Sequence, residues 1–228
     1  MDAATELERP RREALRAELV ARIPWWYSPW VHLAFPSLMG LGLIVLAALF
    51  VHDLRWYEAV FGVFIFLVSN ASEWRAHRGL LHKRTRPLEL IFDRHTPEHH
   101  AVYVRDDMEI RSSREFRLIL IPAYGIVTIF LATSPVTIAL GFLQQWNLAA
   151  VFVMVTMFYV VSYEWLHLSY HLPRESFVGR RWLIRQLRRH HATHHHPPLM
   201  QTWNFNVSLP LWDVVRGTIY KGPERAGL

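Results

Sequence analysis

The chain contains no cysteine, and this absence excludes disulfides, thiolate zinc sites, iron–sulfur clusters and cysteine nucleophiles. Charged residues are also scarce, at 19% of the 228 residues against roughly 25% in an ordinary soluble domain. The sequence has no GxGxxG element that would bind a flavin or a nicotinamide. The chemistry of this chain must therefore depend on other kinds of side chain.

Hydrophobic residues make up 52% of the chain and are gathered into long runs. Residues 118–163 hold 46 residues without a formal charge. A hydrocarbon core of roughly 30 Å needs about 20 helical residues. We therefore expect an all-α integral membrane protein with about four transmembrane helices, near residues 31–51, 56–72, 118–134 and 146–166.

The basic residues lie on one side of these predicted spans. Segments 1–22, 73–117 and 172–228 hold five, ten and nine of the 25 lysines and arginines. Because basic loops stay in the cytoplasm, we expect residues 73–115 and 168–228 to lie on the cytoplasmic side. The net charge of +6 then follows from topology, and we expect no nucleic-acid partner. A multi-pass protein of a bacterial inner membrane or an endoplasmic reticulum membrane fits this pattern.

The first 22 residues carry five acids and five bases and have no apolar segment of the kind found in a cleavable signal peptide. They form either an interfacial helix, with Leu15 and Leu19 on one side, or a solvated tail. With this segment included, residues 1–228 are expected to form a single membrane-embedded domain.

Fourteen histidines are many for a chain of this length, and ten of them fall into four groups on the predicted cytoplasmic side. Long stretches of chain separate most of the groups, so only folding can bring them together. The groups are His77 and His82; His95, His99 and His100; His167 and His171; and His191, His194 and His195.

Most of these spacings suit a helix. His167 and His171 are four residues apart, so both rings project from one helix face. The group at residues 191–195 has i, i+3, i+4 spacing, which predicts one face again. His77 and His82 are five apart, which points them away from each other on an ideal α-helix, and Gly79 between them is expected to loosen the helix or end it.

Imidazole nitrogen is a good ligand for zinc, copper, iron and nickel. One tetrahedral zinc takes about four ligands, so ten histidines indicate two metal ions. His32 and His52 lie near membrane boundaries and are expected to be structural, whereas His190 and His196 flank the fourth group and are expected to support it or to be solvated.

A histidine ligand usually donates its second ring nitrogen to a carboxylate or a carbonyl. Glu73 precedes His77 by four residues and Glu164 precedes His167 by three, so each can share a helix face with a ligand. For Asn206 a role in capping or buried hydrogen bonds is favoured. The candidates for contact with the ligands are Glu73, Asp93, Glu164 and Asn206.

Together these groups resemble the fatty acid hydroxylase/sterol desaturase superfamily. The family's boxes read HxxxxH or HxxxH, then HxxHH or HxxxHH, then a further HxxHH. They match His77 to His82, His95 to His100 and His191 to His195 here. Residues 203–218 also resemble the family's C-terminal stretch, although Asn206 stands where many members have glycine.

The resemblance implies a four-helix transmembrane stalk beneath a cytosolic cap that holds a di-iron centre, with the ten grouped histidines as ligands. It also implies O₂-dependent hydroxylation of a lipid C–H bond. Because the chain has no redox domain of its own, electrons would come from a separate donor, such as a ferredoxin or a cytochrome b5-type protein.

Three other functions stay open at this point. A lipid desaturase or another lipid oxidase of the same superfamily would carry the same boxes. A membrane metal transporter would place polar ligands near mid-membrane, whereas the centres of these spans are apolar. A structural zinc protein would bind zinc instead of iron. The sequence does not define which lipid is the substrate.

Overall fold

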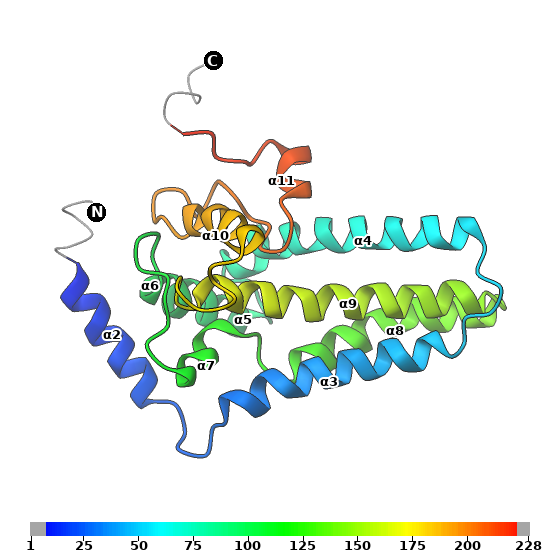
Figure 1. Cartoon of the computed structure of the whole chain (residues 1–228), viewed down its shortest axis with the longest axis horizontal. Coiled ribbons are helices and arrows are strands. Elements are labelled where there is room, and N and C mark those ends of the chain that lie inside the picture. The colour runs from blue at the N-terminus through cyan, green and yellow to red at the C-terminus, as the bar shows by residue number, and fades with distance from the viewer. Residues whose placement is uncertain (1–7, 223–228) are drawn as a thin grey trace.

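The computed structural model describes residues 8–222 and contains no β-strand in that range (Figure 1). This confirms the all-α expectation for the part of the chain that is described. Short elements lie between the long helices and form most of the cap. The elements are α2 (Arg9–Ala21), α3 (Pro29–Ala48), α4 (Trp56–Ala76), η1 (His77–Leu81), α5 (Glu89–Arg94), η2 (His95–His99), α6 (His100–Val102), η3 (Ser113–Glu115), α7 (Phe116–Ile119), α8 (Gly125–Phe142), α9 (Trp146–His171), α10 (Trp182–His194) and α11 (Leu211–Arg216).

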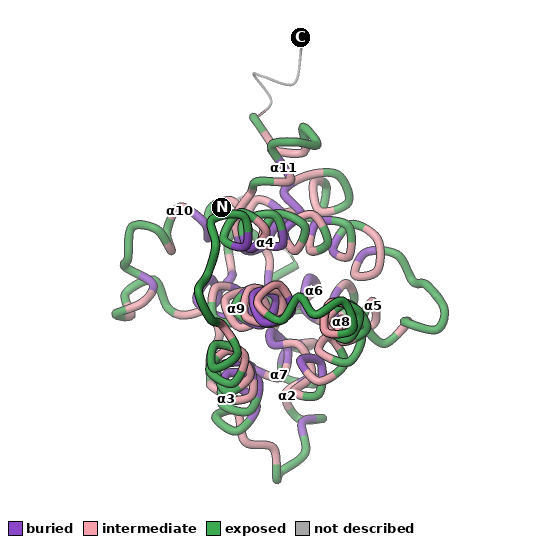
Figure 2. The backbone as a smooth tube through the Cα atoms, turned by 90° about the vertical axis from the view of Figure 1, so that its right-hand side faces the viewer, coloured by how far each residue is buried: buried purple, intermediate pink, exposed green. Residues whose placement is uncertain are grey.

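Four long helices form a bundle, and three of them, α3, α8 and α9, are long and apolar enough to cross a membrane. The fourth, α4, has 21 residues and packs along α9. Viewed along the bundle, α9 lies between α3, α4 and α8 (Figure 2). Large apolar side chains such as Leu38, Val63 and Leu131 are exposed on the outer surface of the bundle, as expected for helices that face lipid. The arrangement agrees with the prediction of about four spans.

The third long helix begins later than the sequence pattern suggests. Leu118 and Ile119 belong to the short helix α7 and are buried in the cap. The chain is extended at Leu120, and Pro122 lies in the connection that follows. The uncharged run begins at residue 118, before α8, because it includes these buried residues of the cap. Hydropathy alone cannot distinguish a buried cap segment from a membrane span. Pro135 lies inside α8, and the turn to α9 is at residues 143–145.

The N-terminal segment forms the helix α2, while residues 1–7 of the predicted tail lie outside the described range. Leu19 is buried in the cap core and Leu15 packs against it. Arg16 is 4% exposed and donates to the Glu115 carboxylate at 2.7 Å. Tyr103 donates to the same oxygen at 2.8 Å. Separating α2 from the cap would leave these buried charges without partners, which is costly. The ion pair therefore fixes α2 to the cap.

Candidate metal centre

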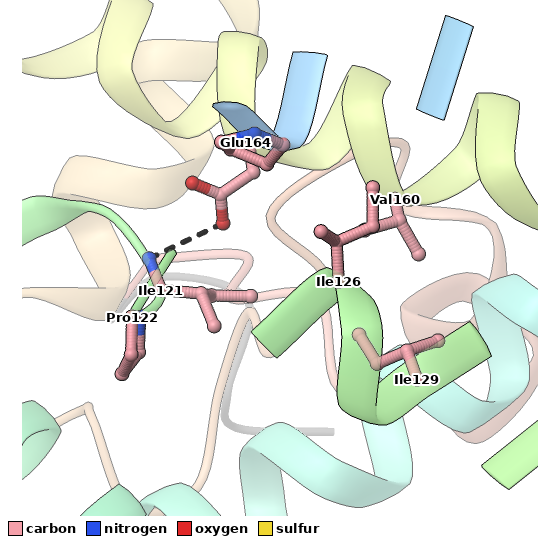
Figure 3. Close-up of a pocket in the computed structure, with 7 residues that line it drawn as sticks. Ile121, Pro122, Ile126, Ile129, Val160 and Glu164 are labelled. Carbon is pink, nitrogen blue, oxygen red and sulfur yellow. Dashed lines mark hydrogen bonds between the residues drawn. The ribbon is translucent and has the colours of Figure 1, made fainter. Parts of the chain in front are cut away.

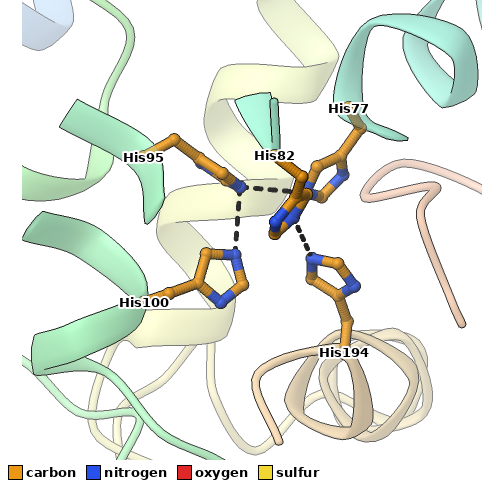
Figure 4. A group of neighbouring side chains, drawn as sticks. All are labelled: His77, His82, His95, His100 and His194. Atoms are coloured by element: carbon orange, nitrogen blue, oxygen red, sulfur yellow. Dashed lines mark hydrogen bonds between the residues drawn. The ribbon is translucent and has the colours of Figure 1, made fainter. Parts of the chain in front are cut away.

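The fold brings all ten grouped histidines together at the end of the bundle that carries the cap. Each ring offers a nitrogen that lies within 4.8 Å of the others in its group, and all ten side chains are buried. The first group, drawn in Figure 4, is His77, His82, His95, His100 and His194. The second group is His99, His167, His171, His191 and His195.

Two π-helices position the pairs that are five residues apart. The segment η1 contains His77 and ends just before His82, and η2 contains His95 and ends just before His100. A π-helix forms i→i+5 hydrogen bonds, and so brings such side chains to one side. The rings of His77 and His82 stack, with centroids 5.1 Å apart. The spacing that looked unsuitable on an α-helix is therefore suited to the local structure.

Besides His99 of η2, the second group comes from α9 and from the C-terminal end of α10. His167 and His171 share one face of α9, with ring centroids 5.2 Å apart. The Nε2 atoms of His191 on α10 and of His195, directly after this helix, are 3.0 Å apart in the second group, whereas His194 belongs to the first. The three rings lie close together, with centroids 4.5–6.2 Å apart, as the predicted shared face requires, and they divide between the two adjacent histidine groups.

Backbone carbonyls accept hydrogen bonds from the other ring nitrogen of most of these histidines. The Nδ1 atoms of His99, His171 and His195 lie 3.0, 2.8 and 2.6 Å from carbonyl oxygens in the segment 103–118. In the first group, His194 Nδ1 lies 2.9 Å from the Trp203 carbonyl and His77 Nδ1 contacts the Phe205 carbonyl. Such contacts orient an imidazole and fix its tautomer. Sequence patterns carry no signal for a backbone acceptor.

Two carboxylates hold the irregular segment that contains the Trp203 and Phe205 carbonyls. Asp213 accepts hydrogen bonds from the backbone N–H of Phe205 at 3.0 Å and of Asn206 at 2.8 Å. Glu73 accepts from the backbone N–H groups of Val207 and Ser208. Buried irregular backbone needs internal partners for its polar groups, and these side chains provide them.

None of the four candidates from the sequence is hydrogen-bonded to a histidine ring within residues 8–222. Asp93 forms a two-bond ion pair with Arg84 at the surface. The Asn206 amide bridges the Asn70 carbonyl and the Asp213 N–H, both at 3.0 Å, which is the structural role favoured from the sequence. Glu73 supports the segment beyond His194 as described above.

The fourth candidate, Glu164, lines a small pocket one helical turn from His167 (Figure 3). One of its carboxylate oxygens accepts from the Ile121 N–H at 3.2 Å. The apolar wall of the pocket comes from Ile126, Ile129 and Val160, among others.

Burial lowers the pKa of the histidines on the cap elements. The pKa of His82 falls to about 4 because of desolvation, and that of His194 falls to about 3 because of desolvation and the neighbouring His82. Neutral imidazole is the form that binds a metal ion. The same causes, burial first and nearby histidines second, hold the pKa well below its ordinary value in His77, His95, His99, His100, His191 and His195.

The arrangement of the ring nitrogens suits a metal ion in each group. In the second group, the Nε2 atoms of His99, His167 and His171 are buried without a hydrogen-bond partner among the described residues. Unpaired buried nitrogens are costly, and a shared metal ion would satisfy them. In the first group, His95 Nε2 lies 3.0 Å from the Nε2 atoms of both His77 and His100. Two nitrogens about 2.1 Å from one metal ion and at right angles are about 3 Å apart.

The remaining histidines lie apart from the two groups. The Nε2–H group of His32 donates to the Ile121 carbonyl at 2.9 Å, and its Nδ1 atom lies 2.7 Å from the Tyr27 hydroxyl, so His32 connects α3 to the cap. His190 lies 3.1 Å from an Asp213 oxygen, and thus supports the segment that holds the first group. His52 and His196 belong to neither group.

A family model described as fatty acid hydroxylase matches residues 62–218, a range that contains all ten grouped histidines. No curated protein matches the chain, and no solved structure does.

Proposed function

The chain belongs to the fatty acid hydroxylase family, and from this premise we propose that it hydroxylates a lipid C–H bond with O₂ at a di-iron centre. The family acts on lipids as membrane oxidoreductases, and three helices of the chain suit a membrane. The observation that carries the proposal is the sorting of ten buried histidines into two adjacent groups of five.

The donor set fits two iron ions. Each group offers five nitrogens and no carboxylate, and imidazole suits iron. Oxidation of an unactivated C–H bond needs a metal that changes oxidation state, which excludes zinc as the working ion. When bound, two iron ions would supply the O₂ chemistry, so no side chain needs to act as a nucleophile.

The protein's own contribution is to hold, orient and enclose this site. The carbonyls of Tyr103, Met108 and Leu118 fix three rings of the second group. Those of Trp203 and Phe205 fix two rings of the first. Full burial of the ten side chains keeps bulk water away, which protects a reactive site from side reactions.

We further propose that the cap lies on the cytoplasmic side and that electrons arrive from a separate ferredoxin or cytochrome b5-type protein. The biased distribution of lysine and arginine supports this orientation. An acidic donor protein would be attracted to the basic cap surface. The lipid would reach the site from the bilayer without crossing water.

Mass spectrometry of total lipids tests the proposal. Cells expressing the intact protein are compared with cells expressing the His171→Ala, His194→Ala variant, which removes one histidine from each group. We expect a lipid one oxygen atom heavier in the first extract alone. A lipid two hydrogens lighter would instead identify a desaturase, the alternative activity of this superfamily.

Extracts that do not differ would leave metal content to decide between the remaining functions. Iron in the intact protein, absent from the double variant, would point to a host that lacks the lipid or the electron donor. A protein that holds only zinc after growth in iron-sufficient medium would contradict the di-iron proposal.

A further inference from the structure

The short helix α11 (Leu211–Arg216) lies beside the membrane-spanning part of the bundle. Its start is anchored by Asn70 of α4, which accepts from the Trp212 N–H at 2.9 Å and donates to the Leu209 carbonyl at 2.8 Å. Asn70 also donates to the Tyr159 hydroxyl of α9 at 3.0 Å. Because Asn70 lies six residues before the end of α4 and close to the cap-side end of the predicted span 56–72, α11 begins at the membrane boundary on the cap side.

The outward face of α11 is apolar. Leu211, Val214 and Val215 are 38%, 63% and 65% exposed, whereas Asp213 points inward and is fully buried. Figure 1 shows α11 lying against α4, outside the bundle. At the membrane boundary, an exposed apolar face of this kind is expected to enter the acyl region of the bilayer.

Two arginines lie at the cap end of this surface. The guanidinium carbons of Arg78 and Arg216 lie 5.1 and 5.4 Å from the ring centre of the buried Trp74. Both side chains are exposed, and neither forms an ion pair or a side-chain hydrogen bond with another residue of the range 8–222. Their donors are therefore available to an anion. Guanidinium groups bind phosphate through paired N–H donors.

We propose that this surface is a binding site for one anionic phospholipid of the leaflet on the cap side. The acyl chains contact Leu211, Val214 and Val215, and the headgroup phosphate binds Arg78 and Arg216. A soluble acidic protein would pair with the arginines alone, whereas an exposed apolar face at the membrane boundary is suited to acyl chains. Phospholipid therefore fits both halves of the surface.

The site adjoins the first histidine group. Arg78 follows His77 in the chain, and Asp213 of α11 holds the Phe205 N–H at 3.0 Å, while the Phe205 carbonyl contacts His77. A bound lipid would thus steady the segment that orients His77. Lipid binding itself requires no oxidation chemistry, so the proposal stands independently of the proposed activity.

Native mass spectrometry of the full-length protein tests the headgroup contact. The protein is released from nanodiscs that contain equal amounts of phosphatidylglycerol and phosphatidylcholine. We expect the intact protein to retain phosphatidylglycerol about tenfold over phosphatidylcholine, and the Arg78→Gln, Arg216→Gln variant to retain the two lipids nearly equally.

The matched control is the Arg180→Gln, Arg181→Gln variant. These two arginines lie over the ring of Phe177, as Arg78 and Arg216 lie over that of Trp74. This variant should keep the preference for phosphatidylglycerol. An equal loss in both variants would show unspecific attraction to net positive charge and would overturn the site. No preference in the intact protein would overturn it as well.

The absence of cysteine permits a second measurement of depth. Bimane attached to Val215→Cys should be quenched by a lipid that carries a doxyl group high on its chain. Bimane on Ala14→Cys, at an exposed position of α2, should be quenched by aqueous iodide instead. If the Val215→Cys probe behaved like the Ala14→Cys probe, α11 would lie in water and the proposal would be wrong.

Discussion

His99 and His100 are neighbours in the chain, yet their rings belong to different histidine groups. His194 and His195 divide in the same way. Consecutive side chains on a helix point in directions about 100° apart. The two members of an HH pair can therefore each bind a different one of two neighbouring metal ions. The two HH pairs are therefore the residues that join the groups into one centre.

Single substitutions within one pair test this division. His99→Ala and His100→Ala should each lower the bound iron from about two ions per chain to about one, because each removes one ligand from one group only. His52→Ala, outside both groups, should leave the iron content unchanged. Elemental analysis of protein purified without chelators measures the ratio. Complete loss of iron from either single variant would show that the two groups do not load independently.

The buried rings also make the metal-free protein sensitive to acid. The folded pKa of His82, about 4, and that of His194, about 3, lie below the ordinary 6.5. Below pH about 6.5 the unfolded chain therefore binds protons that the folded chain does not, and stability falls as pH decreases. The loss is on the order of 1 kcal/mol per such histidine at one pH unit below 6.5.

Thermal unfolding of chelator-treated protein between pH 7.5 and 5.5 measures this dependence. The unfolding temperature should fall with pH, and His82→Ala should fall less steeply because it removes one of the groups. An unfolding temperature that stayed constant over this range would contradict neutral burial of the rings.

At the scale of elements, the π-helices η1 and η2 set the spacing of the first group. They place His77 with His82 and His95 with His100, both five residues apart. An α-helix in either position would turn the second ring away. The prediction that Gly79 loosens the helix has a simple test, since a Cβ at Gly79 would meet no atom within 4 Å.

Gly79→Ala should therefore keep both metal ions and change the unfolding free energy by less than about 1 kcal/mol. Deletion of Gly79 should remove the metal ion of the first group alone, because the remaining spacing of four residues no longer matches a π-helix. Metal analysis of the two variants separates the effect of the glycine from that of the spacing. Metal loss in Gly79→Ala would mean that the glycine itself is required.

Sequence patterns predicted the helical class and about four spans because long uncharged runs and helical spacing are local properties. They did not predict the start of α8, since Leu118 and Ile119 are as apolar in a buried cap as in a membrane. The carbonyl partners of the histidines were equally hidden, because the backbone of Phe205 or Tyr103 leaves no mark in the sequence. The i, i+5 spacing of the histidines indicates the π-helices, but judged against an α-helix it only appeared unfavourable.

At the scale of the whole molecule, the bundle and the cap meet at the two histidine groups. The span α9 ends at His171 and α4 ends directly before His77, so membrane helices deliver ligands into the cap. Glu73 and Asn70 of α4 in turn hold residues 206–212 of the cap against this helix. A lipid in the bilayer and a metal ion in the cap would thus be held by the same structural unit.

The most direct test of this account is the origin of the oxygen atom in the product lipid. Cells expressing the intact protein are grown under heavy-isotope O₂, with the His171→Ala, His194→Ala variant as control. The account predicts one heavy oxygen atom in a lipid found only with the intact protein. A product whose oxygen comes from water, or the same product from the variant, would contradict an O₂-activating histidine centre.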